Sequence, residues 1–378
     1  MEESEKNEKP EPPEKSEKPV EENKLLSILK KINLGILIFF SALYIPILLL
    51  VWLNSLGWIP SSSLLFGFDF VPPILLSYLL IPVLLFSLLG KKWIYAGATL
   101  LVFLLFLLNI GDHSLFYENK NNPKKMETFQ KTVSAVTLNT AQYDKGTEKI
   151  GGEVKSLDPD FIFLQEINFP IEEGKANTEK AFEGYNICIG EVNDSAILSK
   201  HPILEFHEVM LPSKQPGYVD NTPDNQANNI NRYFLHAVAD VDGTKINLLC
   251  LRMIAGRSPN FDVSPRDVFR WGRYLVLTQE IESKVMTDYM KKLNGPIIFA
   301  GDMNAPPNAS SMNEFYRNWT DTALALHMIP HVTFPGKSPI QRLDYIFCDD
   351  NFMPLESFTS NNVISDHRVL YSKLALKR

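Results

Sequence analysis

Carboxylate, amide and imidazole side chains recur at or near the points where short apolar runs of the sequence end. They stand in the segments TLNT, FIFLQE, GDMN, RLDYIF and SDH, and the residues are Asn139, Glu166, Asp302, Asn304, Asp344, Asp366 and His367. Each residue alone is compatible with an ordinary structural role, such as a turn, a solvated edge carboxylate or a helix cap. Together they offer oxygen ligands for a magnesium-like ion, a carboxylate to orient water, amides to hold phosphate oxygens and an imidazole for proton transfer. The set is suited to in-line attack on a phosphoester, which is mainly a problem of positioning and charge neutralisation.

Short apolar runs of β type must position these side chains. Beyond about Lys131 the runs are TVSAVTLN, FIFLQE, SAILS, YFLHAVADV, KINLLCLR, PIIFA, LDYIF and VLYSKLAL. The longest helix between them is predicted from roughly Pro265 to Leu293. Strands in this number, with helices interspersed, predict an α/β fold of two sheets packed face to face in one domain of about 250 residues. Strand ends are where such folds place their sites.

In this order the segments resemble those of the endonuclease/exonuclease/phosphatase family, which includes deoxyribonuclease I, abasic-site endonucleases, neutral sphingomyelinases and inositol-phosphate phosphatases. The similarity extends from roughly Val133 to Leu374 and includes the supporting segments SAILSKHPI and ISDHRVL. Several motifs in one order are a more specific signal than GDMN or SDH alone. The resemblance implies a deoxyribonuclease I-like two-sheet sandwich over residues 131–378 and a metal-dependent phosphoric ester hydrolase, in a membrane-anchored bacterial member of the family.

The resemblance also implies a cofactor, Mg²⁺ or Mn²⁺. By the family pattern, Glu166 is the principal metal ligand. Asn139 and Asp366 then lie close to the ion or to the phosphate that the ion binds. These three residues are therefore the metal-ligand candidates.

The remaining motif residues receive catalytic roles from the same resemblance. Asp302 is expected to orient and deprotonate the attacking water, and Asn304 to hold that water or a phosphate oxygen. Asp344 is expected to accept a hydrogen bond from His367, which raises the basicity of the imidazole and fixes its tautomer. Asn139 belongs to this catalytic set as well as to the metal ligands.

One position departs from the family pattern. In LLCLRM, Cys250 stands where the family usually has a His or a Tyr, and a thiol is a weak hydrogen-bond donor. If the alignment holds, Cys250 points into the site from a strand end. Three explanations remain open: the alignment is off by one, Arg252 supplies the phosphate contact from the next inward-facing position, or the chain is an inactive member. Cys250 and Arg252 are thus the candidate substrate-phosphate residues.

The first third of the chain has a different composition. Residues 1–31 are almost wholly Glu, Lys, Pro, Ser and Asn, which predicts a disordered charged tail. Residues 32–111 are predicted to form three transmembrane helices, in the apolar runs Asn33–Leu53, Val71–Gly90 and Trp93–Ile110. Buried core helices or a cleaved signal peptide are the alternatives, and three long runs so close together disfavour both. Residues 112–130 are predicted to be a linker.

The distribution of basic residues predicts the orientation of these helices. Lys30 and Lys31 precede the first run, Lys91 and Lys92 stand between the second and third, and the first loop has neither Lys nor Arg. Positive residues favour the cytoplasmic side. We therefore expect a multi-pass protein of the cell membrane, with a cytoplasmic tail and an extracytoplasmic catalytic domain.

Charge and location together favour a particular substrate class. The net charge is −7, so no broad basic field is available to collect nucleic acid. An enzyme held at the outer membrane face meets phospholipids and lipid-linked phosphates, and the layout is similar to family phosphatases that act on undecaprenyl pyrophosphate. The expected partners are the lipid bilayer and a phosphorylated lipid or other phosphoester. An anchored nuclease and a catalytically inactive phosphate-binding module are the alternatives, and no protein partner is predicted.

Overall fold

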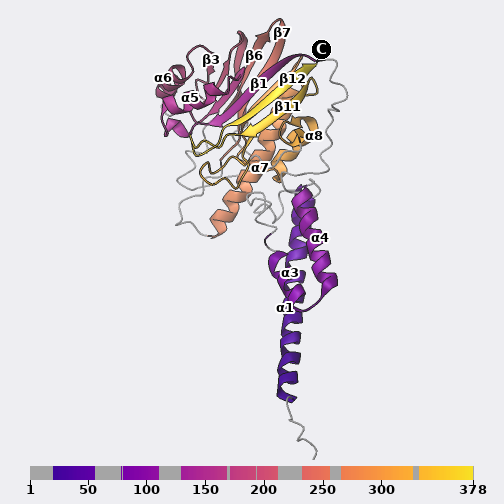
Figure 1. Cartoon of the computed structure of the whole chain (residues 1–378). Helices are drawn as coiled ribbons and strands as arrows, with labels where there is room; N and C mark the ends of the chain where they lie inside the picture. The colour runs from indigo at the N-terminus through magenta and orange to yellow at the C-terminus, as the bar shows by residue number, and fades with distance from the viewer. Residues whose placement is uncertain are drawn as a thin grey trace, which may run out of the picture. The chain divides into compact units, whose positions relative to one another are not determined.

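The structure of the protein is a computed structural model of the whole chain (Figure 1). It describes residues 20–55, 78, 80–109, 129–167, 171–192, 194–211, 232–255, 265–326 and 332–377. The chain divides into two compact units, one of N-terminal helices and one that contains the β-sheets.

Three helices are described in the N-terminal third: α1 (Val20–Ser55), α3 (Leu80–Leu89) and α4 (Trp93–Asn109). Among the described residues, α1 alone is long and apolar enough to cross a membrane, over the 25 residues Leu26–Leu50. The described lengths of α3 and α4 are 10 and 17 residues. One membrane-length helix is therefore supported where the sequence predicted three, and residues 71–77 of the second run lie outside the described residues.

The boundaries of this region differ from the sequence prediction at both ends. Helix α1 begins at Val20, so the second part of the predicted disordered tail is helical, while residues 1–19 lie outside the described residues. Most of the predicted linker is also outside them, and its last residues already form the start of the first strand. Asn33, a polar residue within the apolar run, donates from Nδ2 to the carbonyl oxygen of Phe86 at 3.0 Å, which satisfies its amide against α3.

Two six-stranded mixed sheets and the helices that cover them form the rest of the described structure (Figure 1). The first contains, in spatial order, β11 (Phe352–Thr359), β12 (Leu370–Lys377), β1 (Phe129–Asn139), β2 (Phe161–Gln165), β4 (Ser195–Ser199) and β3 (Asn186–Ile189). The second contains β5 (Ile203–Leu211), β6 (Arg232–Val241), β7 (Thr244–Arg252), β8 (Ile297–Asp302), β10 (Asp344–Cys348) and β9 (Thr320–Asp321). The predicted α/β sandwich is confirmed.

Helices cover the outer face of each sheet. The apolar side chains of α5 (Thr147–Ser156) and α6 (Ile171–Ala181) pack on the first sheet, and those of α7 (Pro265–Met290) and α8 (Asn313–Asn318) pack on the second. Short 3-10 turns are η3 (Ala141–Tyr143), η5 (Ser310–Met312) and η6 (Leu324–Leu326). The predicted long helix is confirmed as α7, within a few residues at its end.

The central strands are apolar on both faces because each is covered on both sides. In β1, Val133 and Ala135 lie between the two sheets, whereas Val136 and Leu138 face the outer helices. Burying one such side chain stabilises the fold by about 1.5–3 kcal/mol. The strand pairs β1–β2 and β7–β8 are parallel, so each pair ends at one edge of its sheet.

Gly301 allows the close approach of β7 and β8 just before the site. Its φ is +153°, and an added Cβ would stand 1.8 Å from the carbonyl oxygen of Leu251. No other residue type fits there without movement of the backbone. The glycine of the GDMN segment is therefore required by backbone packing, and it fixes the position of the aspartate that follows it.

Candidate active site

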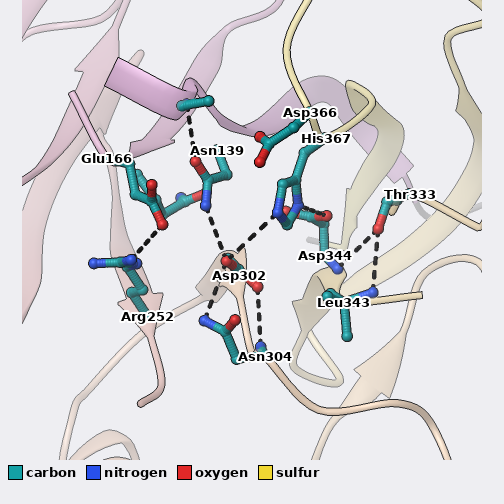
Figure 2. Close-up of polar contacts among 12 residues, drawn as sticks. Asn139, Glu166, Arg252, Asp302, Asn304, Thr333, Leu343, Asp344, Asp366 and His367 are labelled. Atoms are coloured by element: carbon teal, nitrogen blue, oxygen red, sulfur yellow. Dashed lines mark hydrogen bonds and ion pairs between the residues drawn. The ribbon is translucent and has the colours of Figure 1, made fainter. Parts of the chain in front are cut away.

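The candidate site lies where central strands of the two sheets end. β1 ends at Asn139, β2 ends one residue before Glu166, β7 ends at Arg252 and β8 ends at Asp302. Asp344 begins β10 and is the direct cross-strand partner of Asp302. Figure 2 shows these side chains turned toward one region from both sheets. The strand ends thus bring together residues that are far apart in the sequence.

Asp302 accepts hydrogen bonds from both neighbouring amides. Its Oδ2 accepts from Nδ2 of Asn139 at 3.0 Å and from Nδ2 of Asn304 at 3.1 Å. Its Oδ1 accepts from the backbone N–H of Asn304 at 2.9 Å. Asp302 and Asn139 are buried, at 1% and 2% exposure. The carboxylate is therefore held in one orientation by donors from both sheets (Figure 2).

Burial controls the ionisation of Asp302. Desolvation raises the pKa of this carboxyl to about 6, and the charge of Asp344 raises it further, whereas His367 and Arg252 lower it. A carboxylate with a pKa near 6 is a stronger base than an ordinary aspartate and is still ionised at neutral pH. This property suits a residue that accepts a proton from an attacking water.

His367 is paired with Asp344. The ring Nδ1 lies 2.7 Å from Oδ2 of Asp344, and Nε2 lies 4.0 Å from Oδ2 of Asp302. Burial by itself lowers the pKa of His367, but the carboxylates of Asp344 and Asp302, with a smaller effect of Asp366, raise it to about 10. The imidazole is therefore protonated at neutral pH, and Asp344 orients it so that Nε2 faces the site.

Thr333 fixes the strand that carries Asp344. Its hydroxyl oxygen accepts from the backbone N–H groups of Leu343 and Asp344, at 3.1 and 3.2 Å. The carboxylate Oδ1 of Asp344 is buried and accepts no hydrogen bond from the described residues. The pairing with His367 is thus the main polar contact of this side chain. The segment beginning at Thr333 therefore holds the partner of the histidine in place.

Glu166 has a left-handed backbone, with φ at +52°. Its carbonyl oxygen accepts from the hydroxyl of Thr140 at 2.6 Å and from the backbone N–H of Gln142 at 2.8 Å. Such a conformation costs about 1–3 kcal/mol and persists where the surrounding structure holds it. Asn304 has the same feature, with φ at +47°. Both strained residues lie at the candidate site.

Arg252 connects two carboxylates at the edge of the site. Its guanidinium forms a short ion pair with Glu166, and its Nη1 lies 3.1 Å from Oδ2 of Asp194. Asp194 was not singled out from the sequence, because it precedes the strand SAILS, whereas most of the other candidates follow an apolar run. Since β4 is antiparallel to β2, the start of β4 lies beside the end of β2. The backbone oxygen of Asp194 also accepts from Ile167, next to Glu166.

Cys250 was expected to point into the site from a strand end, and this expectation is wrong. Cys250 is fully buried between the two sheets, where its Sγ accepts from Nε2 of Gln165 at 3.2 Å and donates to the oxygen of Leu164 at 3.4 Å. Side chains alternate along a strand, so Cys250 and Arg252 share the inward face, and Arg252 stands at the strand end. The residue of this strand that reaches the site is therefore Arg252.

Oxygen donors suited to a hard divalent ion lie along one side of the site (Figure 2). Glu166 and Asp366 provide carboxylates and Asn139 an amide oxygen, and Figure 2 shows Asp366 on the side of the site nearest Asn139 and His367. Asp366 is exposed, whereas the side chain of Glu166 is 18% exposed. Glu166 already forms an ion pair with the positively charged side chain of Arg252. Donors of this chemistry fit Mg²⁺ or Mn²⁺.

A second cluster offers further potential ligand atoms. One atom each from Asp302, Asp344 and His367 lie within 4.8 Å of one another, and all three residues are buried. In this cluster His367 already uses Nδ1 in its hydrogen bond to Asp344. The donor set of Glu166, Asp366 and Asn139 remains the prediction for the metal ligands.

Sequence comparison identifies the family. A family model described as the Endonuclease/Exonuclease/phosphatase family matches residues 136–367, more than half of the chain. The chain belongs to the endonuclease/exonuclease/phosphatase family. The family consists of phosphoesterases and nucleases that generally depend on divalent metal ions, so this member has the fold of a phosphoester hydrolase. A comparison with curated proteins returned no match.

Several solved structures resemble this family member. An endonuclease/exonuclease/phosphatase from Beutenbergia cavernae is 17% identical, with 66% of this chain and 72% of that chain covered and a TM-score of 0.46. One from Bacteroides vulgatus is 13% identical, covers 66% of this chain and 100% of its own, and has a TM-score of 0.49. Humanized TDP2 from D. rerio is 17% identical, covers 64% and 98%, and has a TM-score of 0.49.

Proposed function

We propose that this family member is a magnesium-dependent phosphoester hydrolase, anchored in the cell membrane, that acts on a lipid-linked phosphate or a phospholipid at the outer membrane face. The observation that supports the hydrolase part of this proposal is the buried network of Asn139, Asp302, Asp344 and His367. It combines an ionised carboxylate held by two amides with an imidazolium held by a second carboxylate. Such a pair can supply general-base and electrostatic catalysis of phosphoester hydrolysis.

Each side chain of the network has a defined task in this proposal. Asp302 accepts the proton of the attacking water, and the side-chain amide of Asn304 or Asn139 holds that water or a phosphate oxygen. His367 presents its Nε2–H to the phosphoryl or leaving oxygen as negative charge develops there. Arg252, at the strand end, contributes positive charge toward the phosphate.

The metal ligands in this proposal are Glu166, Asp366 and Asn139. A bound Mg²⁺ or Mn²⁺ would neutralise phosphate charge and polarise the phosphoryl group. Cys250 gave the inactive-module alternative its only sequence basis, as a weak donor replacing a strong one. Because Cys250 lies in the core, that basis no longer favours an inactive protein.

The membrane part of the proposal rests on the apolar helix α1 and on the acidic charge of the chain. Three spans, an outward catalytic domain and a lipid substrate remain predictions from the sequence. A reporter that is active only in the cytoplasm, fused after Arg378, is expected to be silent. A strong signal would contradict both the orientation and the substrate argument that depends on it.

A substrate panel tests the enzymatic part. The detergent-solubilised full-length protein would be given lipid pyrophosphates, phospholipids and nucleic acid, with and without Mg²⁺, beside the Asp302→Asn variant. Magnesium-dependent turnover of a lipid phosphoester by the wild type alone is the expected result. Turnover of nucleic acid instead would favour the nuclease alternative, and no turnover by the wild type would favour the binding module.

A further inference from the structure

Two buried polar side chains of α7 contact the backbone that carries site residues. Gln279 is 1% exposed and Glu282 is fully buried, and their spacing of three places them on one face of the helix. Nε2 of Gln279 donates to the carbonyl oxygens of Ile254 and Asn304, both at 3.0 Å. One amide group therefore ties the segment after β7 to the segment after β8.

Glu282 holds the same segment from its other side. Its Oε2 accepts from the backbone N–H of Ile254 at 3.0 Å, and its Oε1 lies 2.7 Å from Nε of Arg232. Nη2 of Arg232 donates in turn to the carbonyl oxygen of Arg252 at 3.0 Å. An ion pair with a buried carboxylate is a poor source of stability compared with apolar packing, but here its directional contacts restrain the backbone. Here those contacts end on the backbone of residues 252 and 254.

The restrained segments are the ones whose backbone matters most to the site. Asn304 has a left-handed backbone, and both its backbone N–H and its Nδ2 donate to Asp302. Its Nδ2 also donates to the carbonyl oxygen of Met253 at 3.1 Å. A displaced carbonyl at Asn304 would therefore move the donors that orient the Asp302 carboxylate. Neither Gln279 nor Glu282 was singled out from the sequence, because both occupy ordinary positions of an amphipathic helix.

We propose that Gln279 and Glu282 are positioning residues, which act on catalysis by fixing the backbone of Ile254 and Asn304 and through it the orientation of Asp302 and Arg252. This inference rests on the proposed hydrolase function. It predicts that the loss of the Gln279 amide reduces turnover without removing any group that contacts the substrate.

Gln279→Met tests this prediction because it keeps the length of the side chain and removes its donors. Ser283→Ala is the matched control: Ser283 is fully buried on the same helix, and its hydroxyl donates to Glu280 within α7. Full-length wild type and variants would be compared by kcat, KM, thermal unfolding and hydrogen exchange of peptides covering residues 250–255 and 302–306. We expect Gln279→Met to lower kcat by about 10–100-fold with KM within about threefold, and to speed exchange in both peptides. Ser283→Ala should leave kcat and exchange unchanged.

Glu282→Gln provides a second variant if Gln279→Met does not fold. It keeps an acceptor for Ile254 and removes the charge that holds Arg232, so faster exchange is expected in the first peptide more than in the second, with a fall in kcat. Unchanged kcat, or a fall in kcat without faster exchange, would overturn the positioning role while the wild type remains active. If the wild type itself turns over no phosphoester in the substrate panel, the proposed function fails, and the positioning role fails with it.

Discussion

Asp344→Asn should shift the pH dependence of catalysis toward acid. The asparagine keeps an oxygen that can accept from Nδ1 of His367 but removes the negative charge 2.7 Å away. That charge is the principal group that raises the pKa of His367 against the effect of burial. It also raises the pKa of Asp302. Both groups should therefore titrate at lower pH in the variant.

The magnitude follows from the shift in the wild type. The pKa of His367 rises from 6.5 to about 10, which corresponds to about 5 kcal/mol of interaction favouring the protonated ring. Asp344 is the nearer carboxylate, since Asp302 lies at 4.0 Å from Nε2. An opposite charge at such distances shifts a pKa by about 1–3 units. We expect the imidazole of the variant to titrate near pH 7–9.

Two measurements check this expectation. In a profile of kcat/KM between pH 5 and 9.5, the wild type should rise near pH 6 as Asp302 ionises and then stay level, because His367 remains protonated. Asp344→Asn should resemble the wild type at pH 6 and lose between about twofold and about a hundredfold by pH 9, depending on where between pH 7 and 9 its imidazole titrates. An NMR titration of the histidine rings, with His367 assigned by a His367→Gln variant, gives the pKa directly. An unchanged pKa in Asp344→Asn would refute the electrostatic account of this pair.

Three further substitutions probe the ion, the backbone and the core. Glu166→Gln should raise the Mg²⁺ concentration for half-maximal activity about tenfold or more, and an unchanged metal titration would exclude Glu166 as a ligand. Gly301→Ala should lower the unfolding temperature by several degrees, measured by thermal denaturation, because its Cβ would meet the carbonyl oxygen of Leu251. Cys250→Ala should lower the unfolding free energy in urea by about 1–2 kcal/mol with near-normal kcat, whereas a selective loss of kcat would return the thiol to the site.

Local patterns in the sequence predicted the elements with a strong apolar signal. The central strands β1, β2, β7 and β8 have apolar residues on both faces, which makes them easy to recognise. Edge strands such as β5 and β3 were not predicted, because their side chains are partly exposed and their apolar pattern is weak. The length of a helix within a long apolar segment is equally hard to predict, as the single membrane-length helix among the described residues illustrates.

The site residues were predictable where polar residues end apolar strands, and less so where three-dimensional contacts decide. Strand periodicity places Cys250 and Arg252 on one face, but only the position of the strand end decides which of them reaches the site. Cys250 therefore took the aligned position in the sequence prediction, with Arg252 as an alternative. The polar contacts of Gln279 connect segments about 25 residues apart on each side. No local pattern predicts such contacts.

The charge of Asp302 opposes folding, so removing it should lower the activity of the protein and raise its stability. Its folded-state pKa of about 6 exceeds the ordinary value of 3.8, so the folded protein favours the protonated form. Stability contributed by this group is therefore present at low pH and is lost as the pH rises through about 6. The shift corresponds to about 3 kcal/mol, and the side chain is 1% exposed, so solvent screens little of it.

Asp302→Asn should lower turnover by about a hundredfold or more and raise the unfolding free energy at pH 8 by up to that amount, with little change at pH 4. Urea unfolding of wild type and variant at the two pH values measures the difference. A variant that is destabilised at pH 8 would mean that the hydrogen bonds from Asn139 and Asn304 outweigh the cost of burying the charge.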